Sequence, residues 1–441
     1  MKKYDSYKPS GVDWIGEVPN GWNVMKLLYC LRQAICDGPH ETPKQVEDGI
    51  PFISIDSLND TKDIDFSVVS KFISEEDYQN YMKKAKLEKG DILFSKAATI
   101  GKTAIVGDEK FMVWSPLAIL KNNPQKLNNN FLYHLVNCQR LITSIALSGS
   151  YNTQINVGMR EMEKAYIPVP PLSEQTAIAN YLDAKCAKID NVVAIQQKRI
   201  ELLKELKQSI ITKAVTKGLD KNAKMKESGV EWIGEVPEGW EVKKLKYNCK
   251  INGRVGYKGY TTADLVGEGD GAYTIGGKHI SKNILDLTDA EYISWSKYYE
   301  SPEIMVKKGD ILTAQRGSLG KVAIVKDDIG EATINPSLIL INNIKCSNKF
   351  LYWFMVSNCM LTNIELLNTS TAVPMVSQNQ IENIAIPVPS LSEQTAIAAY
   401  LDKKCAAIDR QIAKIEKQIE LLKEYKQSVI TECVTGKRKV C

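Results

Sequence analysis

The chain of 441 residues contains one long segment twice, and this repeat constrains its fold more than any other feature. The first copy begins at Ile167 and reads Ile-Pro-Val-Pro-Pro-Leu-Ser-Glu-Gln-Thr-Ala-Ile-Ala-Asn-Tyr-Leu-Asp. The second copy begins at Ile386 and differs only by serine for the third proline and alanine for the asparagine. The offset, 386 − 167 = 219 residues, is far longer than a solenoid repeat. Each copy is therefore long enough to fold as a globular domain with an appended segment.

Shorter matching blocks divide each copy into a folded domain and a helix. Both copies open on Trp-Ile-Gly-Glu-Val-Pro, at residues 14–19 and 232–237, and both contain Lys-Gly-Asp-Ile-Leu, at 89–93 and 308–312. A Gly-Lys pair and an apolar run follow each of the latter blocks, which predicts two strands joined by a glycine-containing turn. The copies scarcely agree between these blocks. Each copy is predicted to begin with a mixed α+β domain.

A long helix is predicted after each proline-rich segment, because a helix cannot continue through Ile-Pro-Val-Pro. Ser173 and Ser392 are the predicted N-caps. Farther along, apolar residues recur at steps of four and three, the spacing of a coiled coil. The apolar positions of this stripe are Ile189, Val193, Ile200, Leu203 and Ile210 in the first copy and Ile408, Ile412, Ile415, Ile419, Leu422 and Val429 in the second. Lys207 and Lys426 interrupt it at equivalent places, which would fix the register of the helices.

Two matching stripes predict that the helices pair with each other, antiparallel. The stripe from residue 189 to residue 214 would be about 39 Å long at ~1.5 Å per residue. Two α+β domains would then lie at opposite ends of a rigid spacer, related by a pseudo-two-fold axis, at a separation close to one turn of B-DNA (about 34 Å). The predicted division is a first domain at 1–166, a first spacer helix at 167–220, a second domain at 221–385 and a second spacer helix at 386–441.

The composition argues against a membrane segment and a disulfide framework. The net charge is only +5, so DNA binding would rest on local patches. No run of about 18 apolar residues occurs, and residues 1–7 lack the apolar core of a signal peptide, which predicts a cytoplasmic protein. The ten cysteines are scattered without a Cys-x-x-Cys pair, and with only three histidines a zinc cluster is not expected.

No catalytic motif is complete in the sequence. The Gly-Lys-Thr at 101–103 resembles the end of a phosphate-binding loop, but that loop needs a glycine where Lys96 stands. The Asn-Pro-Ser-Leu at 335–338 lacks the second proline and the aromatic residue of the motif in adenine methyltransferases. We find no nucleophile paired with a base and no set of metal-ligating residues. The chain is therefore expected to be non-catalytic and to bind no cofactor or metal.

Polar and cationic residues in turns are the candidates for DNA contact. Cations on a glycine-bearing turn can approach phosphates, and an arginine can donate two hydrogen bonds to guanine in the major groove. Polar loops near the end of each domain could carry further base contacts. The candidates are Lys96, Lys102, Arg316, Ser318 and Lys321 in the turns and Asn152, Gln154, Gln378 and Asn379 in the loops. For each of them the alternative is a solvated surface side chain.

The tandem blocks resemble the specificity subunits of type I restriction-modification enzymes. The resemblance covers essentially the whole chain and rests on the paired Gly-Asp-Ile-Leu…Gly-Lys and Ile-Pro-Val-Pro…Leu-Ser-Glu-Gln-Thr-Ala-Ile segments. It implies two target-recognition domains, joined by two antiparallel helices, that read a bipartite asymmetric DNA site, one half per domain. The helices would set the unspecified gap and dock the partner subunits. A departure is Lys-Ala-Ala at 96–98, where Arg-Gly or Ser-Gly is commoner, so the turn contact is better supported at Arg316.

The resemblance also implies the partners and their cofactors. Two methyltransferase subunits would use S-adenosylmethionine to methylate adenine at N6, and two restriction subunits would use ATP and Mg²⁺, while this chain binds none of these. The assembled complex would be a type I site-specific deoxyribonuclease and DNA methyltransferase. The alternative function is a coiled-coil scaffold that assembles protein partners without touching DNA.

Overall fold

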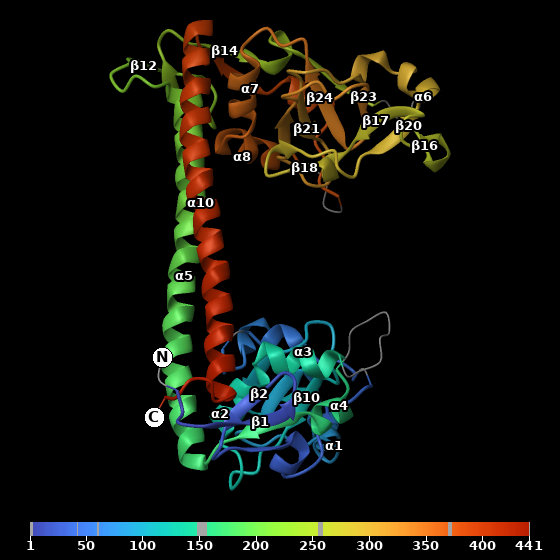
Figure 1. The fold of residues 1–441 in the computed structure, drawn as a ribbon. Helices are drawn as coiled ribbons and strands as arrows, with labels where there is room; N and C mark the ends of the chain where they lie inside the picture. Colours follow the sequence, from blue (N-terminus) through green and yellow to red (C-terminus); the bar gives the residue numbers. More distant parts are fainter. Residues whose placement is uncertain are drawn as a thin grey trace. The chain divides into compact units, whose positions relative to one another are not determined.

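The computed structural model describes residues 3–41, 43–59, 61–147, 157–254, 259–368 and 373–440 (Figure 1). The chain divides into two compact units: unit 1 comprises Met1–Gln197 with Lys417–Cys441, and unit 2 comprises Lys198–Glu416. Both long helices cross this division, since α5 spans Leu172–Lys217 and α10 spans Leu391–Val434. Each unit therefore holds one mixed α/β domain and a part of each long helix.

The domain of unit 1 is built on a four-stranded antiparallel sheet in the order β4-β10-β7-β8. Its strands are β4 (Cys36–Asp37), β7 (Ile92–Ser95), β8 (Thr103–Ile105) and β10 (Leu117–Leu120). Alternate residues of β7 enter two different cores, Ile92 and Phe94 in one and Leu93 in the other. Because both faces of the sheet are covered, its central strands are continuously apolar rather than alternating.

Helices and a second, smaller sheet complete the domain. The helices are α1 (Glu75–Met82), α2 (Asn129–Val136), α3 (Gln139–Leu147) and α4 (Met159–Lys164). The second sheet has the order β6-β5-β9, with β5 (Ile50–Ile53), β6 (Phe72–Ile73) and β9 (Met112–Val113). Within it β5 runs parallel to β9 and antiparallel to β6. The chain after β9 turns directly into β10 of the central sheet.

Unit 2 repeats this plan. Its central sheet has the order β15-β24-β21-β22 and its second sheet the order β16-β20-β17-β23, in which β17 and β23 are parallel. The strands are β15 (Lys250–Gly253), β16 (Leu265–Val266), β17 (Gly271–Ile275), β20 (Glu291–Ser294), β21 (Ile311–Ala314), β22 (Val322–Ile324), β23 (Ala332–Ile334) and β24 (Leu338–Asn342). Its other elements are the hairpin β18 (Ile280–Ser281) and β19 (Ile284–Leu285) and the helices α6 (Trp295–Tyr299), α7 (Asn348–Met355), α8 (Asn358–Leu367) and α9 (Gln378–Glu382).

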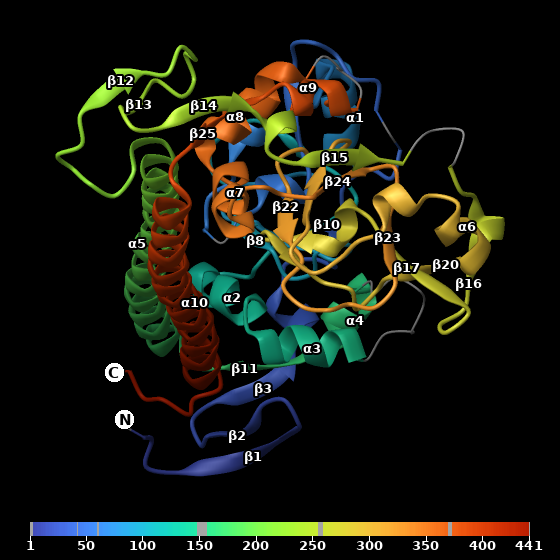
Figure 2. The ribbon, with the colours of Figure 1, turned by 90° about the horizontal axis from the view of Figure 1, so that it is seen from above.

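Short two-stranded ribbons connect each domain to its helix (Figure 2). They pair β1 (Tyr7–Val12) with β2 (Gly16–Pro19), β3 (Asn23–Lys26) with β11 (Tyr166–Val169), β12 (Met225–Glu227) with β13 (Glu235–Pro237), and β14 (Glu241–Lys244) with β25 (Ala385–Val388). The buried Trp22 donates its indole N–H to Glu174 at 3.0 Å, and Trp240 donates to Glu393 at the same distance. The shared tryptophan and glutamate therefore attach the entry segment to the first turn of the long helix.

Both long helices begin two residues earlier than predicted. The long helices begin at Leu172 and Leu391, so Ser173 and Ser392 lie inside the first turn and are not N-caps. In the second copy Ser390 takes this role, because its Oγ accepts a hydrogen bond from the backbone N–H of Glu393 at 3.3 Å. The first copy has proline at the matching position, which offers no side-chain oxygen.

In each unit the α5 and α10 segments run antiparallel and are joined by one ion pair. In unit 1 Lys426 of α10 lies 2.7 Å from Asp190 of α5, and in unit 2 Lys207 of α5 lies 2.7 Å from Asp409 of α10. The two aspartates are equivalent in the repeat, as are the two lysines. The same contact therefore forms in both units with the roles of the helices exchanged.

The predicted apolar stripe lies on the less exposed face of both helices. Every one of its positions is buried or half-buried, as are the two lysines that interrupt it. The buried members are Ile189, Val193, Ile200, Ile408, Ile415, Ile419 and Val429. Their burial confirms the four-three spacing as the packed face of each helix.

The C-terminal tail of unit 1 takes the position that the inter-repeat connection takes in unit 2. Gly436 and Gly218 both have φ +73°, and they lie 3.2 Å from Trp22 and Trp240, respectively, measured from a Cβ built on each glycine. The Tyr7 hydroxyl donates to the carbonyl oxygen of Gly436 at 3.2 Å. Residues near the two chain ends therefore contact each other in unit 1.

Within the described residues, no single helix is long and apolar enough to cross a membrane. The bent pair α7 and α8 together has the required length and composition. Many of its apolar residues, among them Phe350, Phe354 and Met360, belong to the buried core of unit 2.

Candidate nucleic-acid interface

A tight turn joins the two strands that follow the Gly-Asp block in both units. Between β7 and β8, Ser95 closes the turn, since its backbone N–H donates to the Lys102 carbonyl and its Oγ accepts from the Lys102 N–H, each at 2.8 Å. Between β21 and β22, the Ala314 N–H donates to the Lys321 carbonyl at 3.0 Å. The predicted strand, turn and strand are thus confirmed in both copies.

A glycine near the end of each turn is favoured by its backbone conformation. Gly101 and Gly320 have φ angles of +93° and +82°, which other residues rarely adopt. A Cβ on Gly101 would lie 2.8 Å from Ile142 of α3, and one on Gly320 would lie 2.7 Å from Leu361 of α8. The shared glycine therefore lets the turn approach a helix of its own domain.

Backbone contacts establish which residues of the two turns correspond. The Lys96 N–H donates to the Pro116 carbonyl, while Gln315 donates to the Ser337 carbonyl, both at 2.9 Å. Lys96 therefore corresponds to Gln315, and Arg316 occupies the next position, where the first copy has Ala97. The two turn candidates Lys96 and Arg316 therefore lie one position apart in the repeat.

Lys96 is held in an ion pair inside unit 1. Its ammonium group lies 2.9 Å from the carboxylate of Asp37, and its side chain is only 17% exposed. His40 lies 3.2 Å from the same carboxylate. A phosphate would have to compete with Asp37 for Lys96, so Lys96 is a weaker candidate for DNA contact than the sequence suggested.

Arg316 is exposed at the tip of the turn in unit 2. Its Nη2 lies 3.5 Å from the Met375 sulfur, and the next residue, Gly317, donates its N–H to the Pro374 carbonyl at 2.8 Å. Ser318 is also exposed. A guanidinium on a turn braced from both sides can form the paired hydrogen bonds that guanine accepts.

The second lysine of each turn is half-buried. The Lys321 ammonium donates to the carbonyl of Gly277, two residues after β17, at 2.9 Å. Lys102 is half-buried at the matching position of unit 1. These two residues lie at the base of the turn, and Lys321 also has a structural role there.

The loop candidates divide between described and undescribed residues. Gln378 and Asn379 begin α9, close to the Arg316 turn, because the Val376 N–H donates to the Gln315 carbonyl at 3.0 Å. Gln378 uses its Nε2 to bind the Ile251 carbonyl at 2.5 Å, whereas Asn379 is exposed. Asn152 and Gln154 lie outside the described residues.

Sequence reasoning missed a second turn that lies against the first. It joins β9 to β10 in unit 1 and β23 to β24 in unit 2, and it begins with Trp114 in one copy and Asn335 in the other. Its contact with the first turn is the hydrogen bond from Lys96 to Pro116 or from Gln315 to Ser337. The available signal was a proline in both copies just before the last strand of the central sheet, in Ser-Pro-Leu at 115–117 and in Asn-Pro-Ser-Leu at 335–338.

The aspartate of the Gly-Asp-Ile-Leu block has a structural role in both copies. The carboxylates of Asp91 and Asp310 accept the backbone N–H groups of Glu88 and Lys307, each at 2.8 Å. Each aspartate thus closes the turn that leads into the central strand. Burial is the main cause that raises the pKa of both carboxyl groups.

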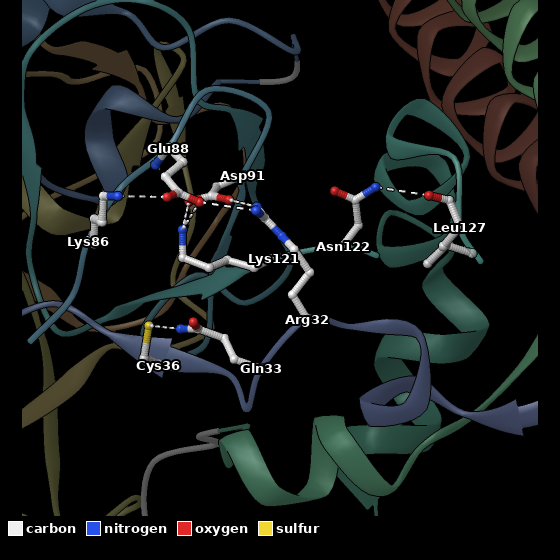
Figure 3. A network of polar contacts seen from close by, with 9 residues as sticks. All are labelled: Arg32, Gln33, Cys36, Lys86, Glu88, Asp91, Lys121, Asn122 and Leu127. Atoms are coloured by element: carbon white, nitrogen blue, oxygen red, sulfur yellow. Dashed lines mark hydrogen bonds and ion pairs between the residues drawn. The ribbon is translucent and has the colours of Figure 1, made fainter. Parts of the chain in front are cut away.

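In unit 1 this aspartate is also the centre of a charge network (Figure 3). Asp91 contacts the ammonium group of the buried Lys121, and Arg32 lies 3.4 Å from its other oxygen. Glu88 is 3.2 Å from Arg32 and 2.9 Å from Lys86. The bond to Lys86 and the charge of Lys121 lower the pKa of Glu88 to about 2. The charged residues lie where β7 begins and β10 ends, so the network connects the two central strands of the sheet.

The described residues include no group of three or more His, Cys, Asp or Glu side chains that could hold a metal ion. Burial raises the pKa of the Cys186 and Cys405 thiols to about 11 in both cases. These thiols are protonated at neutral pH and are poor nucleophiles.

Comparison with known proteins identifies two copies of one domain. The model of the type I restriction modification DNA specificity domain matches residues 39–212 and 237–421. The chain is 31% identical over 442 residues to the type I restriction enzyme MjaX specificity subunit of Methanocaldococcus jannaschii, covering 97% of this chain and 96% of that protein. It is 24% identical to the EcoBI specificity subunit of Escherichia coli, covering 75% and 72%.

A solved structure has the same fold. One chain of a type I R-M system, from a study of its complex assembly and conformational transition, aligns with a TM-score of 0.70 at 16% identity. The alignment covers 95% of this chain and 98% of that one. The tandem arrangement of two domains and two long helices is therefore shared over almost the full length.

Proposed function

Because the chain belongs to the family of type I restriction-modification specificity subunits, which are non-catalytic DNA-recognition proteins, we propose that it reads a bipartite asymmetric DNA sequence, one half with each unit. The single observation that carries this proposal is the pair of turns, β7–β8 in unit 1 and β21–β22 in unit 2, which hydrogen bonds to neighbouring segments hold in place. In both units an equivalent backbone hydrogen bond attaches this turn to the neighbouring turn, but the residue at its tip is Ala97 in unit 1 and Arg316 in unit 2. One scaffold with two different tips suits two different half-sites.

The proposed partners follow from the same membership. Two methyltransferase subunits would dock on the long helices and bind S-adenosylmethionine, and two restriction subunits would supply ATP- and Mg²⁺-dependent cleavage. Such a complex would act on DNA in the cytoplasm. Phosphate contacts would orient the specificity subunit, while base-edge contacts would discriminate the sequence.

We further propose that α5 and α10 form one continuous antiparallel coiled coil with a pseudo-two-fold axis. Two ion pairs support this: α5 supplies the lysine in Lys207–Asp409, and α10 supplies it in Lys426–Asp190. A two-fold axis between the helices would relate these two contacts. The spacer helices would then set the gap between the two half-sites.

The experiment is methylation profiling of DNA from cells that express the chain with the methyltransferase of its own system. Wild-type protein should give one motif with two defined halves. Arg316→Ala should relax one position in one half only, at a cost of about 1–3 kcal/mol in discrimination. Lys326→Ala, which removes an exposed lysine of unit 2 outside the turn, should leave the motif unchanged.

Two results would contradict the proposal. The first is a continuous motif without a gap. The second is an Arg316→Ala variant that changes both halves, or neither, although it still assembles with the methyltransferase. Assembly without any DNA methylation or binding would instead favour the alternative of a protein scaffold.

A further inference from the structure

A small apolar cavity lies in unit 1 at the edge of the second sheet. It measures about 10 Å³, and its lining includes Pro43, Phe52, Lys71, Phe72, Ile73 and Trp114. The Phe52 and Trp114 rings are tilted against each other, with centroids 6.4 Å apart. This volume accommodates about one group of the size of a water molecule or a methyl group. The largely apolar lining favours the methyl group.

The cavity is adjacent to the candidate nucleic-acid interface. Trp114 ends the parallel strand pair and begins the turn whose Pro116 carbonyl accepts the N–H of Lys96 at 2.9 Å. The ammonium group of Lys71 lies 4.9 Å from the centroid of the Trp114 indole. Both side chains are half-buried, so each retains contact with solvent. An apolar cavity with a cation beside it suits a ligand that combines a methyl group with a nearby phosphate.

The residue at the position of Trp114 is polar in unit 2. Asn335 stands where unit 1 has Trp114, and its Oδ1 accepts the N–H and the hydroxyl of Ser337 at 2.9 and 2.6 Å. Ser337 in turn accepts the N–H of Gly277 at 3.0 Å. The polar side chains of this turn in unit 2 therefore hydrogen-bond to each other and to Gly277, whereas the matching turn of unit 1 carries an indole.

We propose that the cavity beside Trp114 binds the C5-methyl group of a thymine in the half-site that unit 1 reads, with Lys71 against a neighbouring phosphate. The inference rests on the proposed function and adds a base to one half of the site. The thymine methyl is the apolar group by which the major-groove edge distinguishes thymine, and its size matches the cavity. The phosphate backbone supplies the negative charge that Lys71 faces.

The test uses the complex of the chain with the methyltransferase of its system and a duplex that carries the motif found by methylation profiling. The half-site of unit 1 is the one that Arg316→Ala leaves intact. Each thymine in it is replaced in turn by deoxyuridine, which keeps the base pairing and removes only the methyl group. One replacement should weaken binding roughly three- to tenfold, the effect of one buried methyl group.

Variants separate this contact from general effects on folding. Trp114→Ala should bind the thymine and deoxyuridine duplexes equally, whereas Trp295→Ala, at a half-exposed tryptophan of unit 2, should keep the difference. Lys71→Met keeps an apolar stem beside the indole and should weaken binding to both duplexes equally, with a salt dependence lowered by about one phosphate contact.

The proposal is overturned if no thymine of that half-site responds to deoxyuridine, or if Trp114→Ala keeps the discrimination. These outcomes leave the proposed function standing, because the complex would still bind its motif. A complex without any sequence preference would instead contradict the proposed function itself.

Discussion

At the scale of single residues, the two turns differ in backbone strain. Ala98 has φ +58° at the position where the second copy has Gly317 with φ +79°. A residue with a Cβ costs roughly 1–2 kcal/mol in this left-handed region. The first copy thus keeps a strained alanine in the turn where the second copy has glycine, in the part of the domain that we propose faces DNA.

Replacing Ala98 with glycine should therefore stabilise unit 1. We expect the free energy of unfolding to rise by about 0.5–1 kcal/mol, because the relief of strain exceeds the added entropy of the unfolded chain. Urea denaturation of the full chain measures the change. The matched control is Gly317→Ala, which should lower the stability of unit 2 by about the same amount. A destabilising Ala98→Gly would show that the turn is not strained.

A second pair of residues differs in its response to pH. In unit 1 His134 lies 2.6 Å from Asp183 of α5, and in unit 2 Trp353 donates its indole N–H to Asp402 of α10 at 2.9 Å. Both aspartates belong to the shared Tyr-Leu-Asp of the repeat. The same carboxylate is therefore bound by an ionisable ring in one copy and by a non-ionisable ring in the other.

Acidification should destabilise unit 1 through His134. Burial lowers the pKa of this imidazole below its usual value near 6.5, despite the opposing effect of Asp183. The folded state then binds fewer protons than the unfolded state, so this contribution to stability is present above about pH 6.5 and is lost as the pH falls toward the lowered pKa. Urea denaturation between pH 7.5 and pH 5 should show the loss.

His134→Trp provides the matched variant, because it copies the residue that unit 2 already uses. It should keep the bond to Asp183 and flatten the pH dependence of unit 1, while Trp353→Phe should leave that dependence unaltered. An unchanged pH dependence in His134→Trp would assign the effect to other ionisable groups.

At the scale of elements, the sequence predicted the long helices, whose apolar residues recur over many turns. It missed the strands and ion pairs that form between residues far apart in the chain. The apolar stripes extend over many turns, so the long helices and their packed faces could be predicted. The second sheet could not, because β9 has only two residues and lies where the copies diverge. Nor could the pairing of Lys96 with Asp37, since no local pattern connects residues that far apart.

The ion pairs between the helices matter more for register than for stability. The Lys207 and Asp409 side chains are 25% and 54% exposed, and pairs of this kind contribute about 0–1 kcal/mol. A slip of one helix by a turn would place each lysine against the wrong partner. The lysines that interrupt the stripe thus have defined partners in both units.

At the scale of the whole molecule, the proposed spacer can be tested by its length. Seven residues inserted after Gln197 and seven after Glu416 would extend both helices at the division between the units and preserve the stripe. Each helix would lengthen by ~10 Å, which corresponds to about three base pairs. Methylation profiling should find both half-sites unchanged and a longer gap.

The same insertion in α5 alone serves as the control. It breaks the register of the two helices and should reduce assembly or methylation rather than lengthen the gap. A double insertion that alters either half-site, or that leaves the gap unchanged, would contradict the role of the helices as the spacer.

The equivalence of Gly218 and Gly436 has a consequence for how such a chain can be made. The segment after α5 packs on Trp240 of the second copy, and the segment after α10 packs on Trp22 of the first copy. Each repeat therefore carries a helix end that fits the other repeat and a tryptophan that receives the other helix end. A gene for one repeat could encode a chain of which two copies pair by exchanging these contacts. Fusion of two such genes would free each recognition domain to diverge separately.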